Sequence, residues 1–142
     1  VIGRDNARTP MQWDTTDYAG FSSAKPWLGV NPNYAKINVE EALANPDSIF
    51  YTYQKLVQIR KENSWLVQAD FELLETAEKV FAYIRKDGDR RFLVVANLSN
   101  EKQDFSVGGK VKSVLIENTT AKEAVEKQTL EPWDAFCVEL TD

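Results

Sequence analysis

The sequence predicts a mainly β protein: an antiparallel Greek-key β-sandwich, preceded by an irregular segment and one or two helices. Three observations support this fold class. Residues 1–37 are rich in turn formers and show no sustained period, residues 38–63 repeat apolar side chains at helical spacing, and residues 64–142 hold short runs of β-branched and aromatic residues. The sandwich is therefore expected to follow the helices along the chain.

The irregular segment, residues 1–37, combines turn formers such as Gly20 and Pro26 with many large apolar side chains. These side chains are Met11, Trp13, Tyr18, Phe21, Trp27, Leu28 and Tyr34. Flexible linkers are poor in such residues. We therefore expect the segment to lie against another part of a larger protein. The chain also begins at Val1 rather than Met, and we expect it to be trimmed.

Residues 38–63 are expected to be helical. Asn38 is followed three residues later by Glu41, which is the spacing of a capping box, and Pro46 ends the short helix that this box begins. Asp47 is then expected to cap a longer helix that runs to about Asn63. Its apolar residues, at spacings of three and four, are Ile49, Phe50, Tyr53, Leu56, Val57 and Ile59.

Residues 64–142 read as short strands separated by turns. The clearest turn is Asp87-Gly88, a favoured pair for a hairpin. Before it, Val80, Ala82 and Ile84 alternate with bulkier or charged residues, so one face of that strand differs from the other. The expected strands are residues 65–67, 70–75, 79–86, 91–98, 103–107, 111–117, 127–130 and 134–140. Because no helix is expected among them, they favour an antiparallel fold.

Composition narrows the functional classes. A chain of 142 residues with 43% hydrophobic and 27% charged residues is typical of a globular protein. Its net charge of −5 argues against nucleic acid and anionic membranes as partners. The sequence contains no histidine, which removes the commonest general base and metal ligand, and we expect no metal or cofactor. The single cysteine, Cys137, favours a reducing compartment, so we expect a cytoplasmic protein.

Functional groups are densest in residues 3–14, GRDNARTPMQWD. The guanidinium groups of Arg4 and Arg8 suit the recognition of paired hydroxyls or carboxylates, and Trp13 offers an apolar face to a sugar ring. The same composition also fits a loop in which both arginines bond carboxylates and carbonyls. The residues alone leave both interpretations open.

Other candidates have simpler structural interpretations. The pair Glu40-Glu41 begins a helix, Asp87 belongs to a turn, and Cys137 lies in an apolar strand. The tryptophans Trp65 and Trp133 are either sugar platforms or packing residues. Asp89 belongs to the same turn as Asp87, and Asn97 and Asn118 match the glycosylation sequon, although no secretory signal supports its use.

Several motifs, in order along the chain, resemble the oligo-1,6-glucosidase group of glycoside hydrolase family 13. They are residues 3–14, AGF at 19–21, PWL at 26–28, VNPNY at 30–34, INV at 37–39 and DSIFY at 47–51. The remainder is similar to the group's bacterial glucan 1,6-α-glucosidases, or dextran glucosidases. The motifs of that part are DFELL at 70–74, VFAYIR at 80–85 and PWDAFC at 132–137.

The resemblance implies a domain organisation. Family members have a (β/α)8 barrel followed by an antiparallel β-domain, called domain C. Residues 1–63 correspond to the C-terminal end of the barrel, with the irregular segment at 1–37 and helices at 38–63. Residues 64–142 correspond to domain C, and the upstream barrel is the expected partner of this chain.

The resemblance also implies a chemistry. Family members are retaining enzymes that use an aspartate nucleophile, a glutamate acid/base and a second aspartate. All three lie upstream of residues 3–14, so no catalytic residue is expected in this chain. The family's arginine at the position of Arg4 holds a glucose unit, which makes Arg4 the one expected substrate-binding residue. Asp5 and Arg8 are expected to support the loop.

The function implied for the parent protein is an exo-acting α-glucosidase that hydrolyses α-1,6-glucosidic bonds of isomalto-oligosaccharides. Trehalose-6-phosphate hydrolase shares most of the opening motifs and is the main enzymatic alternative. A carbohydrate-binding module is an alternative of another class, which exposed, clustered tryptophans would favour and buried tryptophans would oppose. For the chain by itself we favour a structural role without catalysis.

Overall fold

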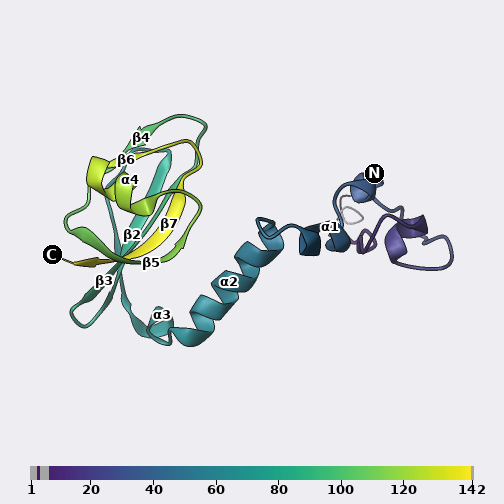
Figure 1. Ribbon diagram of the computed structural model, residues 1–142, viewed down its shortest axis with the longest axis horizontal. Coiled ribbons are helices and arrows are strands. Elements are labelled where there is room, and N and C mark those ends of the chain that lie inside the picture. The colour runs from purple at the N-terminus through teal and green to yellow at the C-terminus, as the bar shows by residue number, and fades with distance from the viewer. Residues whose placement is uncertain (1–2, 4–6, 142) are drawn as a thin grey trace. The chain divides into compact units, whose positions relative to one another are not determined.

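A computed structural model describes residue 3 and residues 7–141 of the chain. The chain divides into two compact units, Val1–Lys55 and Leu56–Asp142 (Figure 1). The first unit contains short helices and loops, and the second contains the β-sheets. The boundary between the units falls inside a long helix, α2.

The first unit is largely irregular, as predicted, and its described residues include two 3-10 turns, one short helix and the start of α2. The turns are η2, Asp17–Gly20, and η3, Pro32–Ala35, and the helix is α1, Val39–Ala44. The predicted cap of α1 is present, because the Asn38 side chain accepts a hydrogen bond from the Glu41 backbone N–H at 2.8 Å. Asn38 is itself buried and donates to the Tyr34 carbonyl.

Helix α2 spans Ile49–Glu62, close to the predicted helix from Asp47 to Asn63. None of its residues is buried, although its apolar positions follow the predicted helical face. Ile49 is 86% exposed and Tyr53 69% exposed. An isolated helix of this length is marginal in water, so this face requires a surface to cover it.

The second unit begins with a short helix where a strand was predicted. Residues 65–67 form part of α3, Trp65–Gln68, so the prediction of a strand there is wrong. The contacts of the helix account for the difference. The Trp65 ring stacks on Phe92 with centroids 3.7 Å apart, and Arg85 donates to the carbonyls of Leu66 and Ala69 at 3.0 and 2.7 Å.

Five antiparallel strands form the main sheet, in the order β1-β2-β3-β7-β5. They are β1 (Asp70–Leu73), β2 (Val80–Asp87), β3 (Arg90–Asn97), β5 (Lys110–Glu117) and β7 (Ala135–Thr141). The hairpin between β2 and β3 pairs Asp87 with Arg90, as the turn pair predicts. Strand β7 lies between β3 and β5, so the chain crosses over before it completes the sheet.

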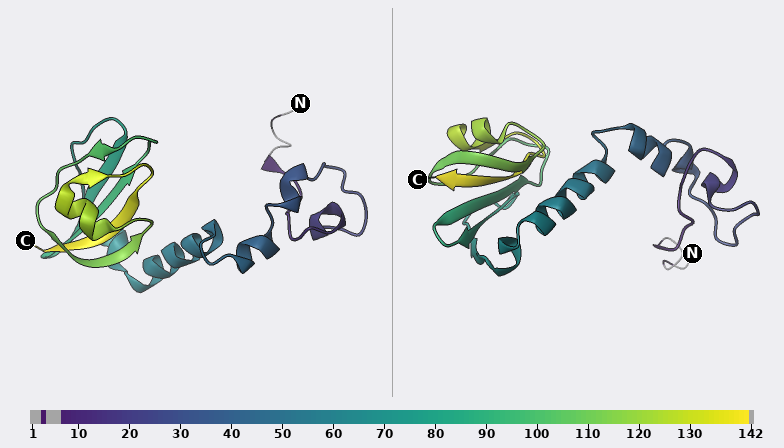
Figure 2. Two further views of the ribbon diagram at one scale, coloured as in Figure 1. Left: turned by 45° about the horizontal axis from the view of Figure 1, so that its top comes forward. Right: turned by 60° about the horizontal axis from the view of Figure 1, so that its bottom comes forward.

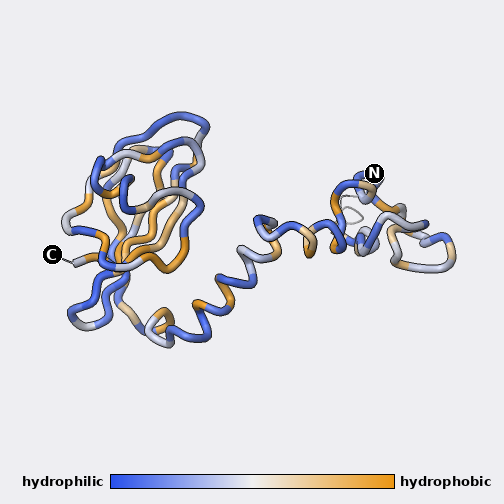
Figure 3. The backbone as a smooth tube through the Cα atoms, viewed as in Figure 1, coloured by the Kyte–Doolittle hydropathy of each residue, from blue (hydrophilic) through white to orange (hydrophobic). Residues whose placement is uncertain are grey.

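A smaller layer covers one face of this sheet (Figures 1 and 2). It consists of helix α4 (Ala121–Lys127) and the two-stranded sheet of β4 (Gln103–Asp104) and β6 (Thr129–Leu130). The core lies between the two layers. In Figure 3, the strands of this unit carry many hydrophobic residues, which are coloured orange. Its largest fully buried members include Ile84, Leu93, Leu130 and Val138.

The mainly antiparallel β-fold is confirmed, with one further difference in detail. Helix α4 was not predicted, and the strand predicted at residues 127–130 shortens to β6. The residues of α4, AKEAVEK, are mostly strong helix formers, and Ala121, Ala124 and Val125 face the core at helical spacing. A run of seven residues is too short for this pattern to be distinguished from a loop between strands by sequence alone.

Candidate functional site

The predicted substrate-binding residue, Arg4, lies outside the residues that the structure describes, as does Asp5. Arg4 as a substrate contact therefore stays a prediction. Residues 7–14 are described, and they form a loop that folds back on residues 31–40. This loop is the described part of residues 3–14, the segment with the densest functional groups.

Gln12 and Trp13 fasten the loop to the start of α1. The Gln12 side-chain amide donates to Asn33 Oδ1 at 3.0 Å and to the Ile37 carbonyl. The carbonyls of Gln12 and Trp13 accept from the backbone N–H groups of Val39 and Glu40 at 2.9 and 3.0 Å. Both carbonyls therefore satisfy donors at the helix N-terminus, which no intrahelical partner can reach.

Three consecutive residues in the following turn have left-handed backbone conformations. The φ angles of Tyr18, Ala19 and Gly20 are 55°, 60° and 65°. For residues other than glycine this costs about 1–3 kcal/mol each. The buried Ala19 offsets the cost, because its carbonyl accepts from the N–H groups of both Trp13 and Asp14. Gly20 is required, because a Cβ there would lie 2.5 Å from Asp14 Oδ2.

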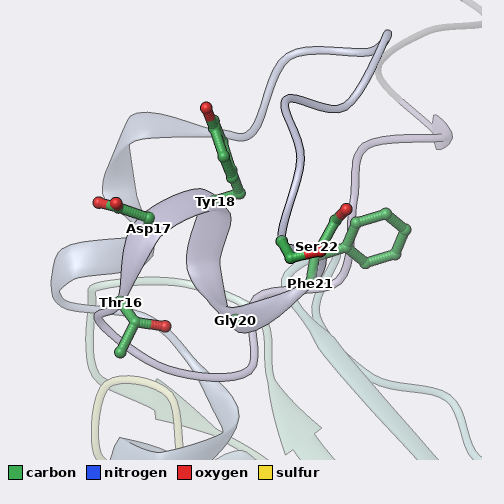
Figure 4. A pocket seen from close by; sticks show the side chains of 7 residues that line it. Thr16, Asp17, Tyr18, Gly20, Phe21 and Ser22 are labelled. Carbon is green, nitrogen blue, oxygen red and sulfur yellow. The ribbon is translucent and has the colours of Figure 1, made fainter.

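An open cavity of about 820 Å³ lies at this turn (Figure 4). It is lined by Thr16, Asp17, Tyr18, Gly20, Phe21, Ser22 and Ser23. In Figure 4, Asp17 and Phe21 point away from each other, on opposite sides of the turn. The carboxylate of Asp14 accepts hydrogen bonds from the hydroxyl and the N–H of Thr16, and these bonds lower its pKa. Asp14 is therefore an anion that holds the loop, not a proton donor.

Arg8 also has a loop contact in the structure. Its guanidinium lies over the Trp27 ring, 5.6 Å from the centroid, which is a cation–π arrangement. This contact agrees with the expectation that Arg8 supports the loop. Within residues 3 and 7–141, no group of three or more His, Cys, Asp or Glu side chains is placed to hold a metal ion.

The remaining sequence candidates occupy structural positions. Glu40 and Glu41 lie in the first turn of α1. Asp87 ends β2 and pairs with Arg90 at 3.9 Å. Burial raises the pKa of the Cys137 thiol to about 11, so it stays protonated and is a poor nucleophile at neutral pH.

In the part of the chain that the structure describes, no helix is long and apolar enough to cross a membrane.

Two family models match the chain. The α-amylase catalytic-domain model matches residues 1–69, and the maltogenic amylase C-terminal-domain model matches residues 71–137. The glucan 1,6-α-glucosidase of Streptococcus pneumoniae is 84% identical over 140 residues, which cover 99% of this chain. The oligo-1,6-glucosidase of Bacillus cereus is 43% identical, again over 99% of this chain. The chain belongs to glycoside hydrolase family 13, the α-amylase family.

Solved structures of this family are similar to the chain. The crystal structure of Bacillus licheniformis trehalose-6-phosphate hydrolase matches 99% of it with a TM-score of 0.86 and 36% identity. The isomaltulose synthase of Klebsiella sp. matches with a TM-score of 0.85 and 34% identity. The chain spans 26% of the length of the two curated relatives above and 27% of that hydrolase chain.

The two tryptophans of the second unit, the β-unit, differ in their exposure to solvent. Trp65 is buried with its ring stacked on Phe92, and the Arg90 guanidinium lies 6.0 Å from its ring centroid, so it is a packing residue. Trp133 is 59% exposed and has a φ of 64°. A bulky side chain in this conformation is an outlier, which usually reflects a constraint from surrounding contacts.

A second polar pocket, which the sequence analysis did not identify, lies next to the turn that carries Trp133. It has a volume of about 160 Å³ and is lined by Lys102, Thr119, Thr120, Glu123, Ala124, Lys127, Thr129, Glu131 and Asp134. Lys102 comes from one segment, and the other eight lining residues fall within residues 119–134. These eight lie before, in and after helix α4, so the fold of this segment brings them together.

Proposed function

We propose that the chain is the C-terminal part of an exo-acting, retaining α-glucosidase that hydrolyses α-1,6-glucosidic bonds of isomalto-oligosaccharides. The observation that carries this proposal is the 84% identity with a glucan 1,6-α-glucosidase over 140 residues. The oligo-1,6-glucosidase of Bacillus cereus, at 43% identity, supports the same bond specificity.

In this proposal residues 1–63 complete the catalytic barrel and residues 64–142 form domain C. The family models support such a division, because one ends at residue 69 and the other begins at residue 71. The role of the chain itself is structural. The exposed Trp27 and the uncovered apolar face of α2 support this role, since both are surfaces that a barrel could cover.

Arg4 remains the proposed substrate-binding residue, as a donor to hydroxyls of the terminal glucose. The catalytic carboxylates belong to the part of the relatives that this chain does not span. A cytoplasmic location is supported by the free Cys137, because structural disulfides are a feature of oxidising compartments.

Hydrolysis of trehalose 6-phosphate is the second candidate activity. The match to the Bacillus licheniformis trehalose-6-phosphate hydrolase, with a TM-score of 0.86, favours it. The sequence identity to that enzyme, 36%, is much lower than the identity to the glucan 1,6-α-glucosidase. We therefore rank the α-1,6-glucosidase first.

The deciding experiment uses the full-length enzyme and measures kcat/KM for isomaltose and for trehalose 6-phosphate. Preference for isomaltose supports the proposal, and preference for trehalose 6-phosphate rejects it. Arg4→Lys is expected to lower kcat/KM by about 10²-fold, because a single ammonium cannot replace the fork of donors. Arg8→Lys, which keeps the cation beside Trp27, is the matched control and should retain most of the activity.

A further inference from the structure

We propose that the turn Glu131–Asp134 and the polar pocket next to it bind one ring of an α-glucan chain. The class of ligand rests on the proposed function, whereas the position of the site rests on the contacts below. Three features lie at this turn: a pocket lined by hydroxyl and charged side chains, a carboxylate oxygen of the buried Asp134 to which no described residue donates, and, next to the pocket, an exposed tryptophan with a fixed backbone.

The pocket matches the chemistry of a neutral polyol. Three threonines, Thr119, Thr120 and Thr129, supply hydroxyl groups, and the charged residues supply both donors and acceptors. Its two lysines are already paired: Lys102 contacts Glu131 at 2.7 Å, and Lys127 contacts Glu123. With its cations neutralised, the pocket has no excess positive charge to attract a phosphate or a carboxylate.

Its size limits the ligand to one ring. A volume of about 160 Å³ is well below the roughly 300 Å³ at which pockets for drug-sized ligands begin. A single pyranose ring is compact and carries hydroxyls around its rim. The pocket can therefore hold one sugar unit, while the next units of a chain stay outside it.

Asp134 provides an acceptor that the protein itself does not use. It is only 7% exposed and lines the pocket. Its Oδ2 accepts from the Glu131 N–H at 2.8 Å, but no described residue donates to its Oδ1. Buried carboxylate oxygens nearly always have partners, and a hydroxyl of a bound sugar would supply one.

Trp133 lies between Glu131 and Asp134, in the turn that forms one wall of the pocket. Its N–H donates to the Ser99 carbonyl at 3.1 Å, and its carbonyl accepts from Asn118 Nδ2 at 2.9 Å. Asn118 Oδ1 in turn accepts from the Ala135 N–H at 2.7 Å, so contacts on both sides fix the strained backbone. The exposed indole that this backbone carries beside the pocket can stack on the apolar face of a pyranose ring.

The test is an NMR titration of the 142-residue chain, labelled with ¹⁵N, with isomaltotriose. We expect saturable shifts of the Trp133 indole N–H and of the amides at 119, 120 and 129, with a Kd on the order of 1 mM for a one-ring contact. Cellotriose, a β-linked trimer, should bind at least about tenfold more weakly, since its next unit leaves the pocket in another direction.

Two variants and one control separate binding from folding. Trp133→Ala should weaken binding about tenfold, and Thr119→Val, which removes one hydroxyl without changing side-chain size, by several-fold. Trp27→Ala removes the most exposed of the four tryptophans, which is 80% exposed and lies outside this unit, and this variant should bind like the wild type. Each variant's spectrum reports whether the β-unit is folded.

Three results would overturn the proposal: no saturable shifts at residues 119–134, unchanged binding by Trp133→Ala, or equal binding of cellotriose. Because the titration involves no hydrolysis, these failures are separate from failure of the proposed function. An enzyme that hydrolyses isomaltose while the chain fails to bind isomaltotriose rejects this site alone.

Discussion

Arg90 and Glu139 form an ion pair across strands β3 and β7, with Nε and Oε1 3.1 Å apart. The same oxygen accepts from Lys112 Nζ at 3.0 Å, and the Ser113 hydroxyl donates to the other oxygen at 3.2 Å. The Arg90 guanidinium also lies over Phe92, 4.6 Å from the ring centroid. A buried carboxylate therefore connects three strands on the face of the sheet opposite the core.

These contacts predict a pH dependence of stability. The hydrogen bonds from Arg90 and Lys112 lower the pKa of Glu139 from 4.5 to about 2. Because the folded-state pKa lies below the unfolded one, the pair stabilises the fold above pH 4.5 and loses this effect as the pH falls towards 2. Both cations are about half exposed, so we expect about 1–2 kcal/mol after screening.

The measurement is urea unfolding of the wild type and Glu139→Gln at pH 7 and at pH 2.5. The variant should be less stable at pH 7, and the difference should shrink at the lower pH. Glu72→Gln is the control, because Glu72 pairs with Lys86 at an exposed position, where screening by water leaves an ion pair little effect on stability. A difference between wild type and Glu139→Gln that is as large at pH 2.5 as at pH 7 would contradict the assignment.

Arg85 is predicted to hold α3 on the sheet. It donates to the carbonyls of Leu66, Ala69 and Asp70, which a lysine could satisfy only in part. Arg85→Lys should therefore lower the free energy of unfolding by about 1–3 kcal/mol. Lys86→Met, at the next position along β2, removes only an exposed ion pair and should cost less than about 1 kcal/mol. Equal effects of the two substitutions in urea unfolding would show that the hydrogen bonds of Arg85 contribute little to stability.

Two glycines test the difference between backbone strain and steric clash. Gly88 and Gly109 both have positive φ, 59° and 104°. A Cβ at Gly88 meets nothing within 4 Å, whereas a Cβ at Gly109 would lie 2.5 Å from the Thr141 carbonyl oxygen. Gly88→Ala should cost about 1–2 kcal/mol from strain alone. Gly109→Ala should cost more, and thermal unfolding that ranks the pair in the opposite order would contradict this account.

Much of the fold could be predicted because local signals agreed with each other. The Asp87-Gly88 pair and the alternation at Val80, Ala82 and Ile84 define one hairpin, and the pairing of β2 with β3 follows from them. The cap at Asn38 was predictable for the same reason, since its partner is only three residues away. Signals of this kind involve neighbours in sequence and need no tertiary information.

The errors arose where tertiary contacts determine the structure. Residues 65–67 look like a strand, but the stack of Trp65 on Phe92 and the donors of Arg85 favour a helical turn. The pocket around Asp134 shows the same limit, because it forms only when residues 119–134 fold around helix α4 and Lys102 packs beside them. Arg4, in contrast, was proposed through family resemblance and lies outside the described residues, so its role stays a prediction.

The chain by itself should lack glucosidase activity. In addition, backbone amides in its two units should be protected from hydrogen exchange to different degrees. Strands β2, β3 and β7 bury their backbone in the core layer, so their amides should exchange by global unfolding. In residues 7–37 protection should be confined to amides with backbone acceptors, such as those of Trp13 and Ala19, because the aromatic side chains around them are exposed. Exchange measured by mass spectrometry, beside an assay on p-nitrophenyl α-glucoside, checks both statements. Uniform protection of residues 7–37 in a monomer would show that this segment needs no barrel to order it, and turnover would place catalytic groups within the chain.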